Sequence, residues 1–326
     1  MTFSQTVKSE ILKSARNLQG SSASAFLTAV LKSAGSLTLV PNGFAFALDS
    51  DNLDFVTLCK NVSCEQLSVD AEIETHEIRA KNQPAHTCTF DSSVGEKLHL
   101  TTRDSDGTLS LNDDAATLIP TDPTLKRSFM QGLFVASGSV VIPQPSEDEQ
   151  WANTLSTKYH LELRFTDEAF ATAVAENFAE LSLHFLSRKS GFVLYLKDSE
   201  KIADFLVYVN ATNAAFTLTN IIISRSLRNA SNREANCIAA NIDKAVAAAG
   251  KQLAAITAIR QMGTFDALPD QLKDIALLRE KYPEATLDEI ADMLCISKSG
   301  ASHRFTKLIQ LSQSLPYKGG QRNTDE

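Results

Sequence analysis

The chain has 326 residues, of which 43% are hydrophobic, and a formal net charge of -8. This length exceeds the usual size of one domain, and the apolar content excludes a globally disordered chain. The five cysteines are odd in number and lack a CxxC spacing, which excludes a disulfide framework and argues against a zinc site.

The first third of the chain predicts helices alternating with pairs of strands. Phe3, Val7 and Ile11 recur every four residues, which puts them on one face of a first helix. Ser22 is placed to cap a second helix that ends near Ala34. We then expect strands at 36–40 and 44–48 around a turn at 41–43, a helix at 51–64, strand-like residues at 67–73 and 87–90, and a helix from 94.

The same order of elements begins again after Pro120. We expect a helix at 124–136, a strand at 138–142, a polar loop at 143–150, a strand at 159–165, a helix at 167–181 capped by Asp167, hairpin strands at 183–188 and 192–197, and a helix through 209 capped by Ser199. Ala-Gly-Ser-Leu at 34–37 recurs as Ser-Gly-Ser-Val at 137–140. An internal duplication explains this pattern. A chance recurrence of a Gly-Ser turn is the alternative.

A polar and basic segment follows the second copy. It holds three arginines and two asparagines: Arg225, Arg228, Asn229, Asn232 and Arg233. We interpret residues 223–235 as a linker that joins two domains and makes some DNA contact. A solvated hinge, with helix caps from Asn229 or Ser231, is the alternative. Residues 236–259 are rich in alanine and predict one long helix, interrupted at 264–269.

The C-terminal part predicts a helix-turn-helix. Pro269 can occupy the first turn of a helix with Leu272, Ile275 and Arg279 on its inward side. Thr286 followed by Glu289 fits the capping-box pattern. A tight turn at 295–296 then leads to a last helix at 298–310, capped by Ser297. Cys295 stands where glycine is common, so a positive φ there costs about 1 kcal/mol.

In a helix-turn-helix the second helix enters the major groove of DNA with its N-terminal residues. The residues expected to contact DNA are Thr286, Ser297, Lys298, Ser299, Gly300, Ser302, His303, Arg304 and Lys307. Residues 1–220 hold 17 Lys and Arg against 27 Asp and Glu, whereas residues 221–326 hold 14 against 12. An acidic body with a locally basic end is typical of a protein that contacts nucleic acid through one module. An ordinary helical hairpin with a polar face is the alternative.

Two predicted helices resemble the LAGLIDADG motif: residues 27–35, Leu-Thr-Ala-Val-Leu-Lys-Ser-Ala-Gly, and residues 130–138, Met-Gln-Gly-Leu-Phe-Val-Ala-Ser-Gly. The small residues Ala29 and Gly132 would let the two helices approach closely. In LAGLIDADG nucleases the residue before the final glycine is an acid that binds a divalent metal. Here these positions hold Ala34 and Ser137, which offer no carboxylate. We therefore expect no metal, no cofactor and no nuclease activity at this site.

The whole chain resembles the WhiA family of Gram-positive bacterial regulators. The similarity rests on the Ser-x-x-Val-Lys-x-Glu stretch at 4–10, the Arg/Asn-rich stretch at 228–244 and Ile-Ser-Lys-Ser-Gly-x-x-His-Arg at 296–304. It implies an α+β fold with tandem LAGLIDADG-like αββαββα repeats, related by a pseudo-two-fold axis, joined to an all-α helix-turn-helix domain. We expect repeat one at 1–112, repeat two at 113–222, the basic linker at 223–235, the helical domain at 236–316 and a flexible tail at 317–326.

The resemblance implies a non-enzymatic, sequence-specific transcriptional regulator tied to cell division, chromosome segregation and, in sporulating relatives, sporulation. Its expected partner is double-stranded promoter DNA, with a monomer favoured. A metal-dependent nuclease using other acids is one alternative. A platform for a sigma factor or another regulator, with secondary DNA binding, is another. Residues 1–16 do not resemble a signal peptide and apolar runs are short, so we expect no membrane contact and a cytoplasmic, nucleoid-associated protein.

Overall fold

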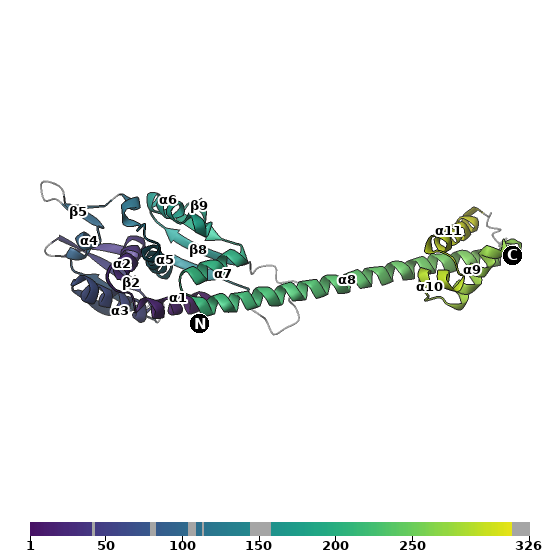
Figure 1. Ribbon diagram of the computed structural model, residues 1–326, viewed down its shortest axis with the longest axis horizontal. Helices are drawn as coiled ribbons and strands as arrows, with labels where there is room; N and C mark the ends of the chain where they lie inside the picture. The colour runs from purple at the N-terminus through teal and green to yellow at the C-terminus, as the bar shows by residue number, and fades with distance from the viewer. Residues whose placement is uncertain (41–42, 79–82, 104–108, 113, 144–157, 315–326) are drawn as a thin grey trace, which may run out of the picture. The chain divides into compact units, whose positions relative to one another are not determined.

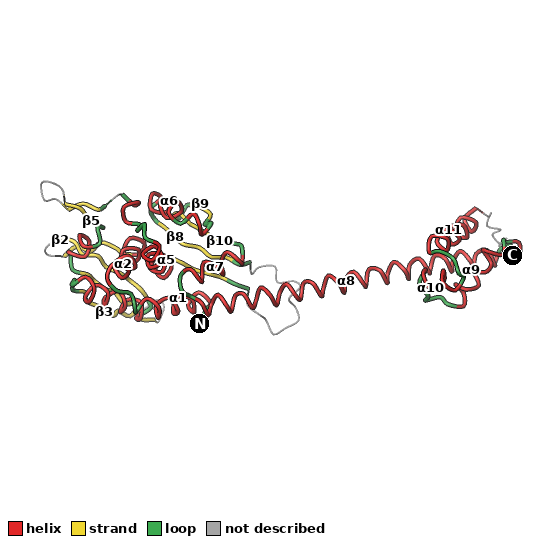
Figure 2. The backbone as a smooth tube through the Cα atoms, in the orientation of Figure 1, coloured by secondary structure: helices red, strands yellow, loops and turns green. Residues whose placement is uncertain are grey.

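The computed structural model describes residues 1–40, 43–78, 83–103, 109–112, 114–143 and 158–314. The chain divides into two compact units, Met1–Ser224 and Arg225–Glu326. The first combines helices and sheets, and the described part of the second is helical (Figures 1 and 2). Helix α8 (Thr212–Gln261) crosses the boundary between them.

The first half of Met1–Ser224 consists of α1 (Phe3–Ala15), α2 (Gly20–Ala34), β1 (Gly35–Val40), β2 (Gly43–Ser50), α3 (Leu53–Asn61), a π-helical turn (Val62–Gln66), β3 (Ala71–Ile78), β4 (Gln83–Phe90) and α4 (Ser93–Lys97). A small hairpin, β5 (Thr101–Arg103) and β6 (Leu109–Leu111), and a 3-10 turn (Ala115–Leu118) follow; none of these was predicted. Strands β1 to β4 form an antiparallel sheet in the order β1-β2-β4-β3.

The second half consists of α5 (Pro123–Ser137), β7 (Gly138–Val141), β8 (His160–Phe165), α6 (Glu168–Asn177), a 3-10 turn (Ala179–Leu181), β9 (His184–Arg188), β10 (Gly191–Leu196) and α7 (Ser199–Tyr208). Its sheet has the order β7-β8-β10-β9. Each repeat therefore runs helix, two strands, helix, two strands, helix, and pairs its strands in the same order. This confirms the predicted tandem αββαββα architecture.

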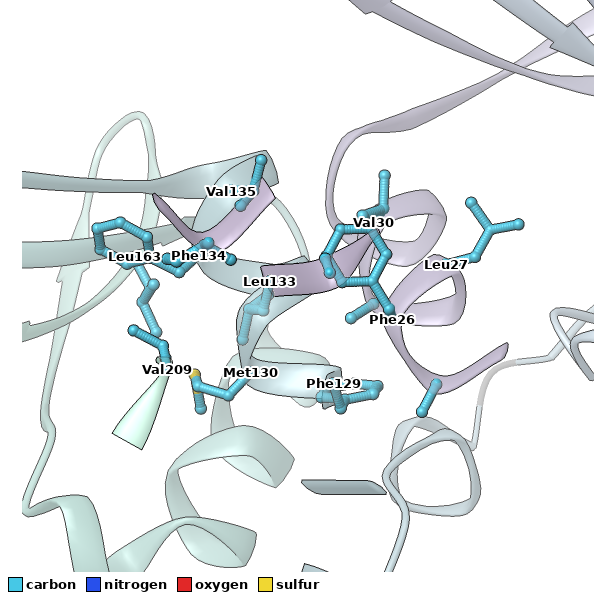
Figure 3. Close-up of a cluster of buried hydrophobic side chains, with 14 of the residues drawn as sticks. Phe26, Leu27, Val30, Phe129, Met130, Leu133, Phe134, Val135, Leu163 and Val209 are labelled. Carbon is cyan, nitrogen blue, oxygen red and sulfur yellow. The ribbon is translucent and has the colours of Figure 1, made fainter. Parts of the chain in front are cut away.

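Helices α2 and α5 pack against each other at the centre of this unit, and their apolar side chains form its core. Phe26 of α2 and Phe129 and Leu133 of α5 are fully buried there (Figure 3). The two backbones come very close at Gly132, where an added Cβ would lie 2.2 Å from the carbonyl oxygen of Phe26. The expectation that a small residue permits this approach is confirmed for Gly132.

Some helix starts differ from their prediction by one to three residues. Asp167 caps α6 as expected, accepting the N–H of Phe170 at 3.2 Å. Helix α7 is capped by Asp198 instead of Ser199, because the Asp198 carboxylate accepts two free N–H groups of the first turn. Helix α2 begins at Gly20, so Ser22 lies inside it. The predicted turn at 41–42 and most of the loop at 143–150 lie outside the described residues.

The segment interpreted as a linker between domains is helical. Residues 223–235 lie inside α8, so neither Asn229 nor Ser231 can cap a helix there. The predicted helix at 236–259 is confirmed as a later part of α8. The start of α8 is held by Glu10 of α1, whose carboxylate accepts the N–H groups of Asn213 and Ala214 at 3.1 and 3.0 Å. These N–H groups have no partner inside the helix, which explains why an acid is placed there.

The second unit packs the end of α8 against three shorter helices: α9 (Asp270–Lys281), α10 (Leu287–Met293) and α11 (Lys298–Ser314). A 3-10 turn (Phe265–Ala267) separates α8 from α9, as the interruption at 264–269 predicted. The core of this unit contains Ile256, Ile259, Leu272, Ile275, Ile290, Ala291, Ala301, Phe305 and Leu308. Within the described ranges, no helix has the length and apolar character needed to cross a bilayer.

Candidate nucleic-acid interface

Helix α10 begins with the capping box that the sequence predicted. The Thr286 hydroxyl accepts the N–H of Glu289 at 3.2 Å, and the Glu289 carboxylate accepts the N–H of Thr286 at 2.7 Å. Hydrogen bonds from the Thr286 backbone and side chain lower the pKa of Glu289 below its usual range. The Thr286 hydroxyl, named as a DNA contact, therefore already has a structural partner in the protein.

The turn between α10 and α11 is closed by two backbone hydrogen bonds. Cys295 donates to the carbonyl of Asp292 at 3.0 Å, and Ile296 donates to the carbonyl of Ala291 at the same distance. Cys295 has a φ of 52°, in the left-handed region. The turn thus keeps a positive φ at a residue that carries a Cβ, despite the cost expected from the sequence. A backbone strain of about 1 kcal/mol is therefore built into the turn.

Ser297 caps α11 as predicted. Its hydroxyl oxygen accepts the N–H of Gly300 at 3.1 Å and lies 3.0 Å from the Ser299 hydroxyl. The helix continues to Ser314, past the predicted end at 310. Because a helix N-terminus presents free N–H groups, the start of α11 can donate hydrogen bonds to a phosphate oxygen.

The polar residues of α11 lie on the side away from its core contacts. Ala301, Phe305 and Leu308 are buried, whereas Lys298, Ser299, Ser302, His303 and Lys307 are exposed, and Gly300 and Arg304 are half-buried. Three of the four positively charged or imidazole side chains here, those of His303, Arg304 and Lys307, form no ion pair within the described part of the chain. One helix therefore brings together the predicted contact residues from 297 to 307.

Lys298 differs from the other basic residues of α11, because it is already paired. Its Nζ lies 2.6 Å from Oδ2 of Asp288 on α10. Both side chains are more than half exposed, so solvent screens the pair and its contribution to stability is small. Asp288 was not predicted as part of this interface. Its separation of ten residues from Lys298, across a turn, is not a spacing that any helix periodicity marks.

Arg279 holds several elements of this unit together. Only 2% of it is exposed, and its guanidinium donates to Gln252 of α8 at 2.9 Å and to the Ala285 carbonyl at 2.5 Å. It also lies 5.2 Å from the centre of the Phe305 ring on α11. Burial lowers the pKa of Arg279. These contacts fix the loop before α10 and support the inner face of α11.

The residues of the Arg/Asn-rich segment lie on one face of a helix, an arrangement that was not predicted from the sequence. Because α8 is continuous, Arg225, Arg228, Asn229, Asn232 and Arg233, at spacings of three and four residues, lie on the same side. All are exposed except Arg225, which is half-buried. The side chain of Arg233 donates to the Asn229 carbonyl at 3.2 Å.

The two positions that hold an acid in LAGLIDADG nucleases lie at the C-terminal ends of α2 and α5. Ala34 and Ser137 are the last residues of these helices. The Ser137 hydroxyl donates to the Leu133 carbonyl at 3.0 Å. Among the residues that the structure describes, no three neighbouring His, Cys, Asp or Glu side chains are placed to hold a metal ion. The two LAGLIDADG-like helices therefore end without an acid.

Two family models match the chain from residue 126 to residue 312, and relatives cover nearly all of it. Residues 126–228 match the WhiA LAGLIDADG-like domain, and residues 231–312 match the WhiA C-terminal HTH domain. The probable cell division protein WhiA of Lacticaseibacillus casei (strain BL23) is 31% identical over 319 residues, covering 96% of this chain and 97% of the relative. The same-named protein of Enterococcus faecalis (strain ATCC 700802 / V583) is 30% identical over 321 residues, covering 97% and 98%.

A solved structure shows the same fold. The crystal structure of full-length DUF199/WhiA from Thermatoga maritima superposes with a TM-score of 0.54 at 20% identity and covers 97% of this chain and 99% of that one. The second unit is thus a helix-turn-helix domain, and the first is a LAGLIDADG-like domain that lacks both motif acids. The chain belongs to the WhiA family.

Proposed function

We propose that this protein is a sequence-specific, DNA-binding transcriptional regulator that acts in cell division. The observation that carries the proposal is the polar and basic outer face of α11, at the position where a helix-turn-helix enters the major groove. The relatives named as probable cell division proteins support the cellular role. We extend the proposal to chromosome segregation and, in sporulating relatives, to sporulation.

The roles of the individual side chains follow from their place on α11. Lys298, Ser299 and Ser302 lie in its first turns and are assigned to base edges and nearby phosphates. His303, Arg304 and Lys307 extend this surface along the helix. Lys298 must exchange Asp288 for DNA, because its ammonium already contacts that carboxylate. The cost of the exchange is small because the pair is exposed.

The Arg/Asn face of α8 is proposed as a second contact. Its three arginines suit phosphate oxygens, and its asparagines suit either a phosphate or an adenine edge. We propose the same domain limits as from the sequence, with the LAGLIDADG-like repeats at 1–112 and 113–222 and the helix-turn-helix domain at 236–316. Residues 223–235 connect them as part of α8.

The LAGLIDADG-like unit is proposed to be non-catalytic. Hydrolysis of a phosphodiester by a metal-dependent nuclease needs carboxylates that hold the cation against the scissile phosphate. Ala34 and Ser137 cannot provide them. We propose that the protein works as a monomer on double-stranded promoter DNA in the cytoplasm. Incubation with supercoiled plasmid and magnesium tests the non-catalytic role, since nicking abolished by EDTA would contradict it.

The DNA-reading role is tested on promoter fragments identified by chromatin immunoprecipitation. Fluorescence anisotropy should show that Arg304→Ala and Lys307→Ala each weaken binding to a target promoter about tenfold, on the scale of one lost specific contact. Lys201→Ala removes an exposed charge from α7, outside the helix-turn-helix, and serves as the matched control. Unchanged promoter affinity in both α11 variants would reject this interface.

A further inference from the structure

A cavity of about 750 Å³ lies beside helix α1 in the LAGLIDADG-like unit. Its lining comes from α1, from the segment that leads into α3, and from the end of α5 with the start of β7. Helix α1 packs against α3, α5 and β7, so the whole cavity belongs to one compact unit. Cavities that hold small molecules have volumes of about 300–1,000 Å³. The size therefore suits a small molecule.

One part of the cavity lining is apolar. Leu12 of α1, Phe55 of α3 and Val135 of α5 are buried residues of the core that also line the cavity. Apolar side chains combined with a few polar groups are typical of a site that takes a small organic ligand. The apolar part favours contact with the non-polar portion of such a ligand.

The charged part of the lining has an excess of positive charge. It contains three cations, Lys8, Lys13 and Arg16, and two acids, Asp51 and Asp54. The side chains of Arg16 and Asp54 form an ion pair at 3.6 Å. The two lysines form no hydrogen bond or ion pair with any other residue that the structure describes. Their ammonium groups are therefore available to an anion.

Lys8 differs from an ordinary surface lysine because it is half-buried. Burial lowers the pKa of its ammonium, and the charge of Asp51 partly offsets this effect. The two side chains do not form an ion pair, so the ammonium has lost part of its water without gaining a direct partner. Charges attract more strongly where water is partly excluded, so Lys8 binds an anion more strongly than an exposed lysine does.

The start of α3 adds hydrogen-bond donors to the same cavity. Asn52 caps this nine-residue helix by accepting one N–H of the first turn at 3.2 Å. The N–H groups of Leu53 and Asp54, which both line the cavity, have no hydrogen-bond partner among the described residues. Free N–H groups at a helix start suit phosphate oxygens. Because Asp51 precedes the cap and acts on Lys8, that lysine lies near this helix start.

We propose that this cavity binds a small molecule that carries a phosphate group. Lys8 and the free N–H groups of α3 contact the phosphate, and Lys13 adds positive charge. A lysine ammonium serves as a compact charge for phosphate, while the N–H groups donate to its oxygens. The non-polar part of the molecule lies on Leu12 and Phe55. The proposal goes beyond DNA recognition, because it gives the LAGLIDADG-like unit a ligand of its own.

The test titrates the full-length protein with pyrophosphate and with ADP and measures binding by calorimetry. Lys8→Gln should weaken the binding of both by about tenfold or more, on the scale of one lost hydrogen bond to a charged group. Lys60→Gln is the matched control. It removes another half-buried lysine of the same unit, on α3 but outside the lining of this cavity, and should leave both affinities unchanged.

ADP carries a nucleoside as well as phosphates, so it should bind more tightly than pyrophosphate by resting on the apolar lining. Equal affinities would overturn the apolar contact. The proposal as a whole is overturned if pyrophosphate does not bind at millimolar concentration, or if Lys60→Gln weakens binding as much as Lys8→Gln does. The unfolding temperature of Lys8→Gln without ligand should match that of the unchanged protein. A lower value would show that Lys8 serves the fold and not a ligand.

A second arm separates a small molecule from DNA as the source of the phosphate. Lys8→Gln should bind a random-sequence duplex as tightly as the unchanged protein does, since the cavity is assigned to a small molecule. Weaker duplex binding would assign Lys8 to the DNA backbone and overturn the proposal.

Discussion

Nζ of Lys298 on α11 lies 2.6 Å from Oδ2 of Asp288 on α10, so a carboxylate holds the first basic residue of the proposed reading helix. The pair also joins the two helices of the helix-turn-helix across the turn. An acid at this place lowers the local positive potential that DNA meets. We therefore expect Asp288 to limit non-specific binding, which depends on charge alone.

We expect Asp288→Asn to strengthen DNA binding. The substitution frees Lys298 and removes one negative charge beside the interface, and exposed pairs of this kind contribute up to about 1 kcal/mol, or roughly fivefold in affinity. Fluorescence anisotropy at low and high salt measures the gain, which should shrink as salt rises. Asp292→Asn, also exposed on α10, is the control. An equal gain from both would show that net charge, and not this pair, sets the effect.

Cys295→Gly should stabilise the turn of the helix-turn-helix. A residue with a Cβ pays about 1 kcal/mol at a φ of 52°, and glycine does not. Hydrogen exchange of peptides covering 286–310 should slow by several-fold. Cys237→Gly makes the same change in the interior of α8, where glycine costs about 1 kcal/mol, and should speed exchange locally. Faster exchange around the turn in Cys295→Gly would contradict the strain argument.

The sequence predicted those features of the fold that depend on short-range patterns. Alternating strands such as 159–165, and the capping box of Thr286 and Glu289, are local signals, and the structure confirms them. The Arg/Asn segment was misread because a helix that is polar on most sides lacks the apolar repeat by which helices are recognised. Only the structure shows that this segment lies within one continuous helix, α8.

The cluster of charged side chains around Glu162 could not be predicted, although Arg164 and Arg188 both contact its carboxylate. Glu162, Arg188 and Tyr195 come from three strands, and only the pairing register places them on one face. The same holds for Asp288, whose partner lies across a turn. Such contacts depend on tertiary geometry, whereas the residues of α11 share one helix and could be named beforehand.

Acid should destabilise the second sheet through Glu162. Burial opposes ionisation of Glu162, but hydrogen bonds from Arg164 and His160 lower its folded-state pKa. Its ionised form therefore stabilises the fold above the pKa of the unfolded chain, and this contribution is lost as pH falls through the lowered folded-state pKa. Glu162→Gln should be less stable at pH 7 and show a smaller loss between pH 7 and acid. Thermal unfolding of both proteins across this range measures the difference. Parallel pH curves would rule out this role for Glu162.

Gly132→Ala should destabilise the LAGLIDADG-like unit strongly. The added Cβ would lie 2.2 Å from the Phe26 carbonyl oxygen, a backbone atom that can move only if α2 and α5 separate. Separation loosens the packing of Phe26 against Phe129 and Leu133, and overpacking of this kind costs about 1–3 kcal/mol or more. Gly250→Ala is the matched control, because its Cβ would meet open space within α8. Alanine there should stabilise the helix by up to about 1 kcal/mol. The unfolding temperature should therefore fall in Gly132→Ala and rise in Gly250→Ala. Equal shifts in the two variants would show that α2 and α5 tolerate a wider spacing than their close contact implies.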